Sequence, residues 1–310
     1  MRRALRLAKN RAISRVASSA VAYVASKPLP EALALGDRFG GLIYRLLRQP
    51  RELAEQHVRI AFGDTLPAPL RTHMVRSSFV HVARCFCELA KIDEIRERRH
   101  EYFELVGWEN AEKVLAPGRG AVVVTGHIGN WELLAAYWAW MGQPVVAIAR
   151  RVYAEDLNRM LTELRARQGV ESILRESPNS ARQILAAMKR NALLAMLIDQ
   201  DTNVQSVSVP FFGRLARTPV AAASLAIRRE LPAIAAFIQR RPEGGHRITV
   251  LPPFEIERTG DVSADIKNLT RQFNEVIERQ IRANPAEWVW WHRRWRRGPI
   301  VNLDLDPAVA

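Results

Sequence analysis

The chain has 310 residues, of which 48% are hydrophobic and 25% charged; this excludes a wholly disordered protein and allows one large core or two smaller ones. Its 46 Lys and Arg residues against 32 Asp and Glu give a formal net charge of +14, which favours an anionic partner such as nucleic acid, an anionic membrane surface or an acidic protein. Two cysteines, Cys85 and Cys87, exclude the disulfide framework of a small secreted protein and fit a reducing cytoplasm.

Residues 1–116 are predicted to be helical throughout, because Ala, Leu and Arg dominate and the breaks fall at turns rich in proline or glycine. An apolar stretch from Val16 to Ala25 is shorter than the ~20 residues that span a bilayer. It predicts either an amphipathic helix on a membrane surface or an ordinary soluble helix.

The two cysteines fall within this helical region, in the run HVARCFCEL. With His81 they suggest a metal site, but Val82, Phe86 and Leu89 form an apolar helical stripe. The pattern therefore favours a core helix over a metal site.

From residue 117 onward the pattern alternates between strands and helices. Strands are predicted over 121–125, 145–149 and 192–198, and helices over 131–141, 155–168 and 178–190. Thr218 and Pro219 predict the start of a helix that runs to about residue 230. AIAAFIQR and HRITVLP predict an antiparallel pair, and a last helix covers 263–282. The prediction is an α/β domain over 117–310, with a mixed, mostly parallel sheet flanked by helices, behind a helical N-terminal region over 1–116.

The segment GHIGNWE follows the first of these strands and carries the strongest candidates for chemistry. His127 and Glu132 are five residues apart, which in a regular helix is a rotation of about 500° and would separate the side chains. Gly126 and Gly129 allow a turn, and Asn130 as an N-cap places Glu132 in the first helical turn. The carboxyl end of a strand that opens into a helix is where open α/β sheets hold ligands.

A histidine and a carboxylate in such a turn fit general base catalysis. Histidine, with an ordinary pKa near 6.5, can take up a proton at neutral pH, and a carboxylate on its other ring nitrogen fixes the tautomer. The sequence has no Ser or Cys beside His127 and no G-x-S-x-G motif, so the expected nucleophile is a substrate hydroxyl. The alternative is structural, with His127 completing the strand end and Glu132 facing the helix dipole; the spacing leaves both interpretations open.

Three blocks, in the same order, resemble a known family. VVVTGHIGNWELLA, LIDQD followed by SVSVPFFG, and EWVWWHRRWR together resemble the late acyltransferases of lipid A biosynthesis, the lauroyl/myristoyl transferases, from about Leu35 onward. The resemblance implies a glycerolipid-acyltransferase-like fold and transfer of a fatty acyl group from a thioester, usually on acyl carrier protein, to a hydroxyl of a membrane glycolipid. It places the catalytic histidine at His127 and its carboxylate at Glu132, with Gly129 and Asn130 shaping the pocket. No metal or bound organic cofactor is implied.

The second block adds candidates for substrate binding. Asp199 and Asp201 follow a predicted strand and are expected to orient the acceptor or to order a basic neighbour such as Arg175; the resemblance favours a functional role over a plain Asx-rich turn. Phe211 and Phe212 are expected to form an apolar wall near an acyl chain or to lie in the core. The family also uses an arginine in this region. The candidates are Arg150, Arg151 and Arg175, of which Arg175 is preferred.

The third block mixes tryptophan and arginine. Such a mix suits a lipid–water interface, nucleic acid through stacking, or in part a buried strand. The residues expected to contact a membrane or the carrier protein are Trp290, Trp291, Arg293, Arg294 and Trp295.

These observations predict an acyltransferase at the cytoplasmic face of the bacterial inner membrane, peripheral or weakly anchored. The expected partners are acyl carrier protein as donor and an anionic glycolipid, such as a lipid A precursor, as acceptor; nucleic acid is not expected. Two alternatives stay open. One is a basic nucleic-acid-binding protein that uses the Trp/Arg-rich segment, and the other is acylation of a different glycolipid of the phosphoinositol mannoside type.

Overall fold

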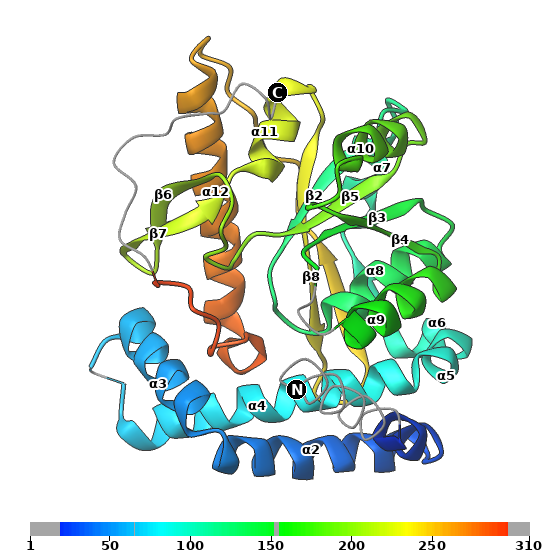
Figure 1. The fold of residues 1–310 in the computed structure, drawn as a ribbon, viewed down its shortest axis with the longest axis vertical. Coiled ribbons are helices and arrows are strands. Elements are labelled where there is room, and N and C mark those ends of the chain that lie inside the picture. Colours follow the sequence, from blue (N-terminus) through cyan, green and yellow to red (C-terminus); the bar gives the residue numbers. More distant parts are fainter. Residues whose placement is uncertain (1–18, 65, 152–154, 297–310) are drawn as a thin grey trace, which may run out of the picture.

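A seven-stranded sheet forms the centre of the protein in the computed structural model, which describes residues 19–64, 66–151 and 155–296 (Figure 1). In sheet order the strands are β1 (Phe103–Val106), β9 (His246–Val250), β8 (Ala233–Arg240), β2 (Ala121–Thr125), β5 (Leu193–Leu197), β3 (Val145–Ala149) and β4 (Val170–Leu174). Neighbouring strands are parallel except at the β8–β9 pair. The predicted mixed, mostly parallel sheet is therefore confirmed.

Helices cover both faces of this sheet, so that its central strand β2 is buried at every residue. Val122 and Val124 pack in one hydrophobic cluster with Phe273, whereas Val123 packs in a second cluster with Leu133. This alternation is the two-residue period of a strand with apolar layers on both sides. The helices of this part of the chain are α7 (Trp108–Leu115), α8 (Trp131–Trp140), α9 (Glu155–Arg167), α10 (Ser180–Lys189), α11 (Ala221–Arg228) and α12 (Val262–Ala283).

The N-terminal helices lie beyond one end of the sheet, at the lower edge of Figure 1. They are α2 (Leu29–Leu46), α3 (Arg48–Phe62), α4 (Ala68–Ala90), α5 (Ile92–Glu97) and α6 (Arg99–Tyr102). Helix α2 packs closely on α4 through glycine: a Cβ at Gly40 would lie 2.4 Å from Val80 Cα. None of the described helices is long and apolar enough to cross a membrane. Of the stretch Val16–Ala25, residues up to 18 lie outside the described part, and residues 19–25 are helical.

The structure corrects the sequence prediction at four strands. Residues 1–116 are not all helical, since β1 lies among them and pairs with β9. Strand β4 and the hairpin of β6 (Ser206–Phe211) and β7 (Arg214–Pro219) were also not predicted. The predicted helix after Thr218 is confirmed as α11, but it begins two residues later than expected, because Thr218 and Pro219 end β7, whose residues 214–219 pair with residues 206–211. The other predicted strands, and α8, α9, α10 and α12, end within two residues of their expected bounds.

The cysteine-containing run is a helix, as predicted. Cys85 and Cys87 are buried in α4, and the Cys85 Sγ lies 3.3 Å from His81 Nε2. Within the described ranges, no three His, Cys, Asp or Glu side chains are grouped so that they would hold a metal ion.

Candidate active site

The two central residues of the site, His127 and Asp199, follow the neighbouring parallel strands β2 and β5. Thr125, at the end of β2, is in register with Leu197, at the end of β5. His127 and Asp199 each follow two residues later, so the sheet register brings them to the same edge. This is the carboxyl end of the sheet, where the chain leaves the strands and can present side chains to a ligand.

Asp199 holds the His127 imidazole through a direct hydrogen bond. The Nδ1–Oδ1 distance is 2.7 Å, and the backbone N–H of His127 donates to Oδ2 at 2.7 Å. Trp288 Nε1–H also donates to Oδ2, at 2.8 Å. Burial alone would raise the pKa of the Asp199 carboxyl, but the neighbouring imidazole and these hydrogen bonds lower it well below its usual range. The ionised carboxylate therefore places the His127 proton on Nδ1 and leaves Nε2 as the acceptor.

Gln200 and a second histidine complete the surroundings of His127 Nε2. The Gln200 side-chain nitrogen lies 3.0 Å from Nε2 and 3.2 Å from Nδ1 of His127, and 2.8 Å from Nδ1 and 3.0 Å from Nε2 of His292, so one amide group contacts both rings. The ring centroids of the two histidines are 4.7 Å apart. Burial, and next the neighbouring His127 ring, lower the pKa of His292 to about 3, so His292 is neutral at physiological pH and can accept a hydrogen bond from the Gln200 amide.

The structure corrects the expected partner of His127, because Glu132 forms an ion pair with Arg165 instead. Arg165 binds both carboxylate oxygens, with Nη2–Oε1 at 2.5 Å and Nε–Oε2 at 2.8 Å. Glu132 lies in the first turn of α8, as predicted, and Asn130 caps that helix by accepting from Leu133 N–H at 3.3 Å. From there the Glu132 side chain extends to α9 rather than back to the imidazole. Whether Glu132 contributes to catalysis stays a prediction.

The remaining predicted binding residues occupy three kinds of environment. Arg175 pairs with Glu176 at 3.2 Å and lies 3.4 Å from Thr202, in the loop after β5. Asp201 lies half-buried in that loop, two residues beyond Asp199. Asn130 is buried, and Gly129, with φ of 62°, packs under the backbone of β8. Asn130 and Gly129 therefore support the turn from its buried side and do not line an exposed surface.

Phe211 and Phe212 lie in the hydrophobic core, the second of the two predicted alternatives. Both are buried, and their rings pack on the Trp/Arg-rich segment. The ring centroids are 5.9 Å apart for Phe211 and Trp288 and 6.2 Å apart for Phe212 and Trp290.

The expected membrane or carrier contact of the Trp/Arg-rich segment is corrected by its burial. Trp290 and Arg294 are fully buried, and Arg294 donates to Arg217 O and Thr218 Oγ1. Trp291 packs on Phe79, Trp295 on His57 and Phe211, and Arg293 alone of the five is exposed. Trp288 and Trp290 are buried in the core beside the site, and Trp291 and Trp295 are partly buried against it.

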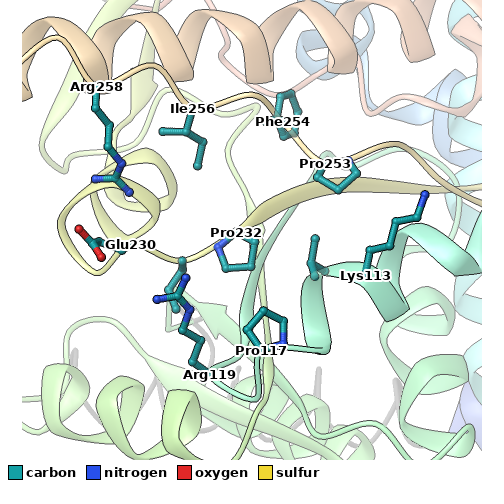
Figure 2. Close-up of a pocket in the computed structure, with 11 residues that line it drawn as sticks. Lys113, Pro117, Arg119, Glu230, Pro232, Pro253, Phe254, Ile256 and Arg258 are labelled. Atoms are coloured by element: carbon teal, nitrogen blue, oxygen red, sulfur yellow. The ribbon is translucent and has the colours of Figure 1, made fainter.

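A hollow of about 360 Å³ lies at the other end of the sheet from His127 (Figure 2). Pro117 and Arg119 precede β2, and Pro232 precedes β8, so the hollow faces the amino ends of these strands. It is separate from the His127–Asp199 pair.

Known proteins give this geometry its context. The sequence profile described as bacterial lipid A biosynthesis acyltransferase matches residues 6–297. The chain belongs to this family. It is 26% identical over 273 residues to the phosphatidylinositol mannoside acyltransferase of Mycolicibacterium smegmatis, covering 87% of each chain. It is 23% identical over 282 residues to the lipid A biosynthesis palmitoleoyltransferase of Escherichia coli, covering 90% of this chain and 89% of the relative.

Among solved structures, the acyltransferase is similar to the 1-acyl-sn-glycerophosphate acyltransferase PlsC of Thermotoga maritima. The sequence identity is 14%, the alignment covers 83% of this chain and 96% of that one, and the TM-score is 0.37.

Proposed function

We propose that this acyltransferase transfers a fatty acyl group from a thioester to a hydroxyl of a membrane glycolipid, with His127 as general base and Asp199 as the carboxylate that orients it. The observation that carries the proposal is the 2.7 Å bond between His127 Nδ1 and a fully buried, ionised Asp199, which leaves Nε2 unprotonated and able to accept a proton.

In the proposed reaction the acceptor hydroxyl takes the place of the Gln200 amide at His127 Nε2. Its oxygen attacks the thioester carbonyl carbon while its proton passes to Nε2. Collapse of the tetrahedral intermediate breaks the carbon–sulfur bond, and the leaving thiolate takes the proton from the imidazolium. Asp199 stabilises the imidazolium between these two steps without being protonated.

A glycolipid acceptor is supported by the names of the relatives. Lipid A acyltransferases and phosphatidylinositol mannoside acyltransferases are similar to this chain at nearly the same identity, so both acceptor types stand. The net charge of +14 fits an anionic headgroup and also fits acyl carrier protein, an acidic protein, as donor.

The exposed face of α2 is our proposed membrane contact, in place of the buried tryptophans. Its apolar side chains recur at helical spacing and are at least 40% exposed: Phe39, Leu42, Ile43 and Leu46, continued by Leu47. Exposed arginines flank this stripe, among them Arg38, Arg45 and Arg48. Apolar side chains bordered by arginine suit peripheral binding to an anionic bilayer, which we place at the cytoplasmic face of the inner membrane.

The catalytic proposal is tested with the purified full chain, acyl carrier protein thioesters of several chain lengths and a panel of lipid A precursors and phosphoinositol mannosides, read by mass spectrometry. His127→Ala should lose nearly all transfer while its circular dichroism and melting temperature stay close to those of the wild type. Unchanged transfer would remove His127 from the mechanism, and transfer to no glycolipid of the panel would refute the acceptor class.

The membrane proposal is tested by co-sedimentation with anionic vesicles. Leu42→Glu/Leu46→Glu should weaken binding, whereas Leu185→Glu on α10, an exposed leucine of another face, should not. Equal binding by both variants would exclude the α2 face. Tight retention on DNA at the same salt concentration, without vesicle binding, would instead support the nucleic-acid alternative.

A further inference from the structure

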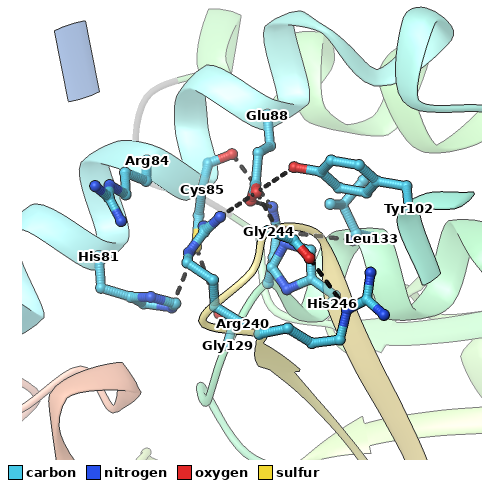
Figure 3. Close-up of polar contacts among 12 residues, drawn as sticks. His81, Arg84, Cys85, Glu88, Tyr102, Gly129, Leu133, Arg240, Gly244 and His246 are labelled. Carbon is cyan, nitrogen blue, oxygen red and sulfur yellow. Dashed lines mark hydrogen bonds and ion pairs between the residues drawn. The ribbon is translucent and has the colours of Figure 1, made fainter. Parts of the chain in front are cut away.

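One buried carboxylate, that of Glu88 in α4, joins four parts of the chain (Figure 3). It accepts hydrogen bonds from Tyr102 Oη at 2.9 Å, Arg240 Nη1 at 2.6 Å and His246 Nε2 at 2.8 Å. The fourth donor is Asn130 Nδ2, at 2.9 Å. Burial alone would raise the pKa of Glu88, but His246 and Arg240 lower it well below its ordinary value, so the group is an anion.

Asn130 connects this carboxylate to the turn that carries His127. Its Oδ1 accepts the N–H of Leu133 at 3.3 Å, while its Nδ2 donates to Glu88 and to the Cys85 carbonyl, at 3.3 Å. A carboxylate anion accepts only, so it fixes which end of the amide points to the helix. The Asn130 side chain thus caps α8 and ties the N-terminal end of that helix to α4.

The opposite side of the turn is held by residues 287–289. Gly129 N–H donates to Glu287 O at 3.1 Å, and Val289 N–H donates to His127 O at 3.3 Å. The turn therefore lies between two fixed supports, with the Glu88–Asn130 bond on one side and the 287–289 backbone on the other. Moving either support would move the His127 backbone relative to Asp199.

We propose that Glu88 is a positioning residue for acyl transfer, acting through Asn130 to hold His127 in register with Asp199. The inference rests on the proposed role of His127. A reacting group displaced by about 1 Å loses on the order of 10²-fold in rate, so a side chain that never meets substrate can still govern kcat.

The test exchanges the hydrogen-bond donor and acceptor between positions 88 and 130. Asn130→Asp keeps a good helix cap but loses the donor to Glu88, and Glu88→Gln loses the anion that orients the amide. In Glu88→Gln/Asn130→Asp the new amide can donate to the new carboxylate, which still caps Leu133 and leaves one anion near Arg240. Each single variant should lower kcat by about 10- to 100-fold with KM changed less than threefold, and the double variant should recover most of this loss.

Tyr102→Phe is the matched control, since it removes a hydrogen bond to the same carboxylate without touching the turn. It should lower the melting temperature and leave kcat within threefold of the wild type. The downfield proton resonance of His127 Nδ1, assigned by its absence from His127→Ala, should shift in Asn130→Asp and stay in place in Tyr102→Phe.

The outcomes separate the two proposals. If His127→Ala retains transfer, the proposed function itself fails. If His127→Ala is inactive while Asn130→Asp is fully active, the positioning role alone fails. It also fails if Tyr102→Phe lowers kcat as much as Asn130→Asp does, or if the folded double variant stays as slow as the slower single one. Should the single variants not fold, activity and the Nδ1 resonance of the double variant decide: near-wild-type values support the role, and a folded, slow enzyme overturns it.

Discussion

Replacing Glu287 by glutamine should stabilise the protein at neutral and alkaline pH but not in acid. Glu287 is 7% exposed in the short 3-10 helix Pro285–Glu287, and both its oxygens accept the Arg240 backbone N–H, at 3.1 and 3.2 Å. Burial raises its pKa to about 7 from an ordinary 4.5, against the opposing effects of this hydrogen bond and of the Arg240 charge. Between these two pH values the folded state keeps a proton that the unfolded chain has released.

The sign and size of the effect follow from this difference. The contribution of the Glu287 carboxyl to stability is fully present below pH 4.5. It is lost as the pH rises through 7, because this carboxyl ionises more easily in the unfolded chain than in the folded protein. At about 1.4 kcal/mol per pH unit, the loss reaches at most about 3.5 kcal/mol. Glutamine keeps the acceptor oxygen and cannot ionise, so the variant should match the wild type at pH 4 and exceed it by up to about 3.5 kcal/mol at pH 8.

Urea unfolding followed by tryptophan fluorescence at pH 4 to 8 measures this difference directly. Glu243→Gln, which removes an exposed carboxylate in the β8–β9 turn, serves as control. A difference between Glu287→Gln and wild type that is constant with pH, or that grows toward acid, would refute the reasoning.

Three further changes test the site and the turn. Asp199→Asn should lower kcat by roughly 10³- to 10⁴-fold with little change in KM, because the amide no longer fixes the imidazole tautomer; steady-state kinetics with less than a tenfold loss would contradict this. Gly129→Ala should cost at least about 3 kcal/mol in urea unfolding and Gly142→Ala only about 1 kcal/mol. Both glycines have positive φ, but a Cβ at Gly129 would lie 1.8 Å from a backbone oxygen, whereas a Cβ at Gly142 meets nothing within 4 Å. Equal losses of stability in the two variants would show that the steric clash at Gly129 is not the cause. Arg165→Met should cost about 3 kcal/mol by leaving the largely buried Glu132 carboxylate unpaired. Adding Glu132→Gln should restore part of that stability, and no recovery in the double variant would mean that the ion pair is not what Arg165 supplies.

Sequence reasoning located the site better than it located the contacts within it. The strand–glycine–helix pattern around His127 correctly predicted the end of β2, the Asn130 cap and the first turn of α8. It could not identify the carboxylate on the imidazole, because that contact depends on β5 being the neighbour of β2. Once the two strands are known to be in register, Asp199 is the residue that matches His127, and the DQD block had already singled it out.

Composition also gave the wrong environment for the Trp/Arg-rich segment, because a membrane interface and a closed core can use the same residue types. Tryptophan and arginine suit a membrane interface and suit a closed core whose indole N–H groups and guanidinium have internal partners, as at Trp288 and Arg294. Strand β1 was not predicted, because its four residues, Phe103–Val106, are too few for a recognisable strand pattern and depend on β9 for their hydrogen bonds.

The close packing of α2 on α4 has a consequence for the size of the acceptor. Helix α4 contacts the turn that carries His127 through Cys85, and α2 covers α4 with Gly36 and Gly40 at the contact. A bilayer resting on the outer face of α2 would thus be separated from the turn by two helix diameters, roughly 20 Å. With the proposed membrane contact on α2 and the proposed role of His127, a hydroxyl next to the glycerol backbone of a phospholipid would lie too close to the membrane plane to span that thickness. A lipid with a headgroup of several sugars would span it while its acyl chains stay in the bilayer.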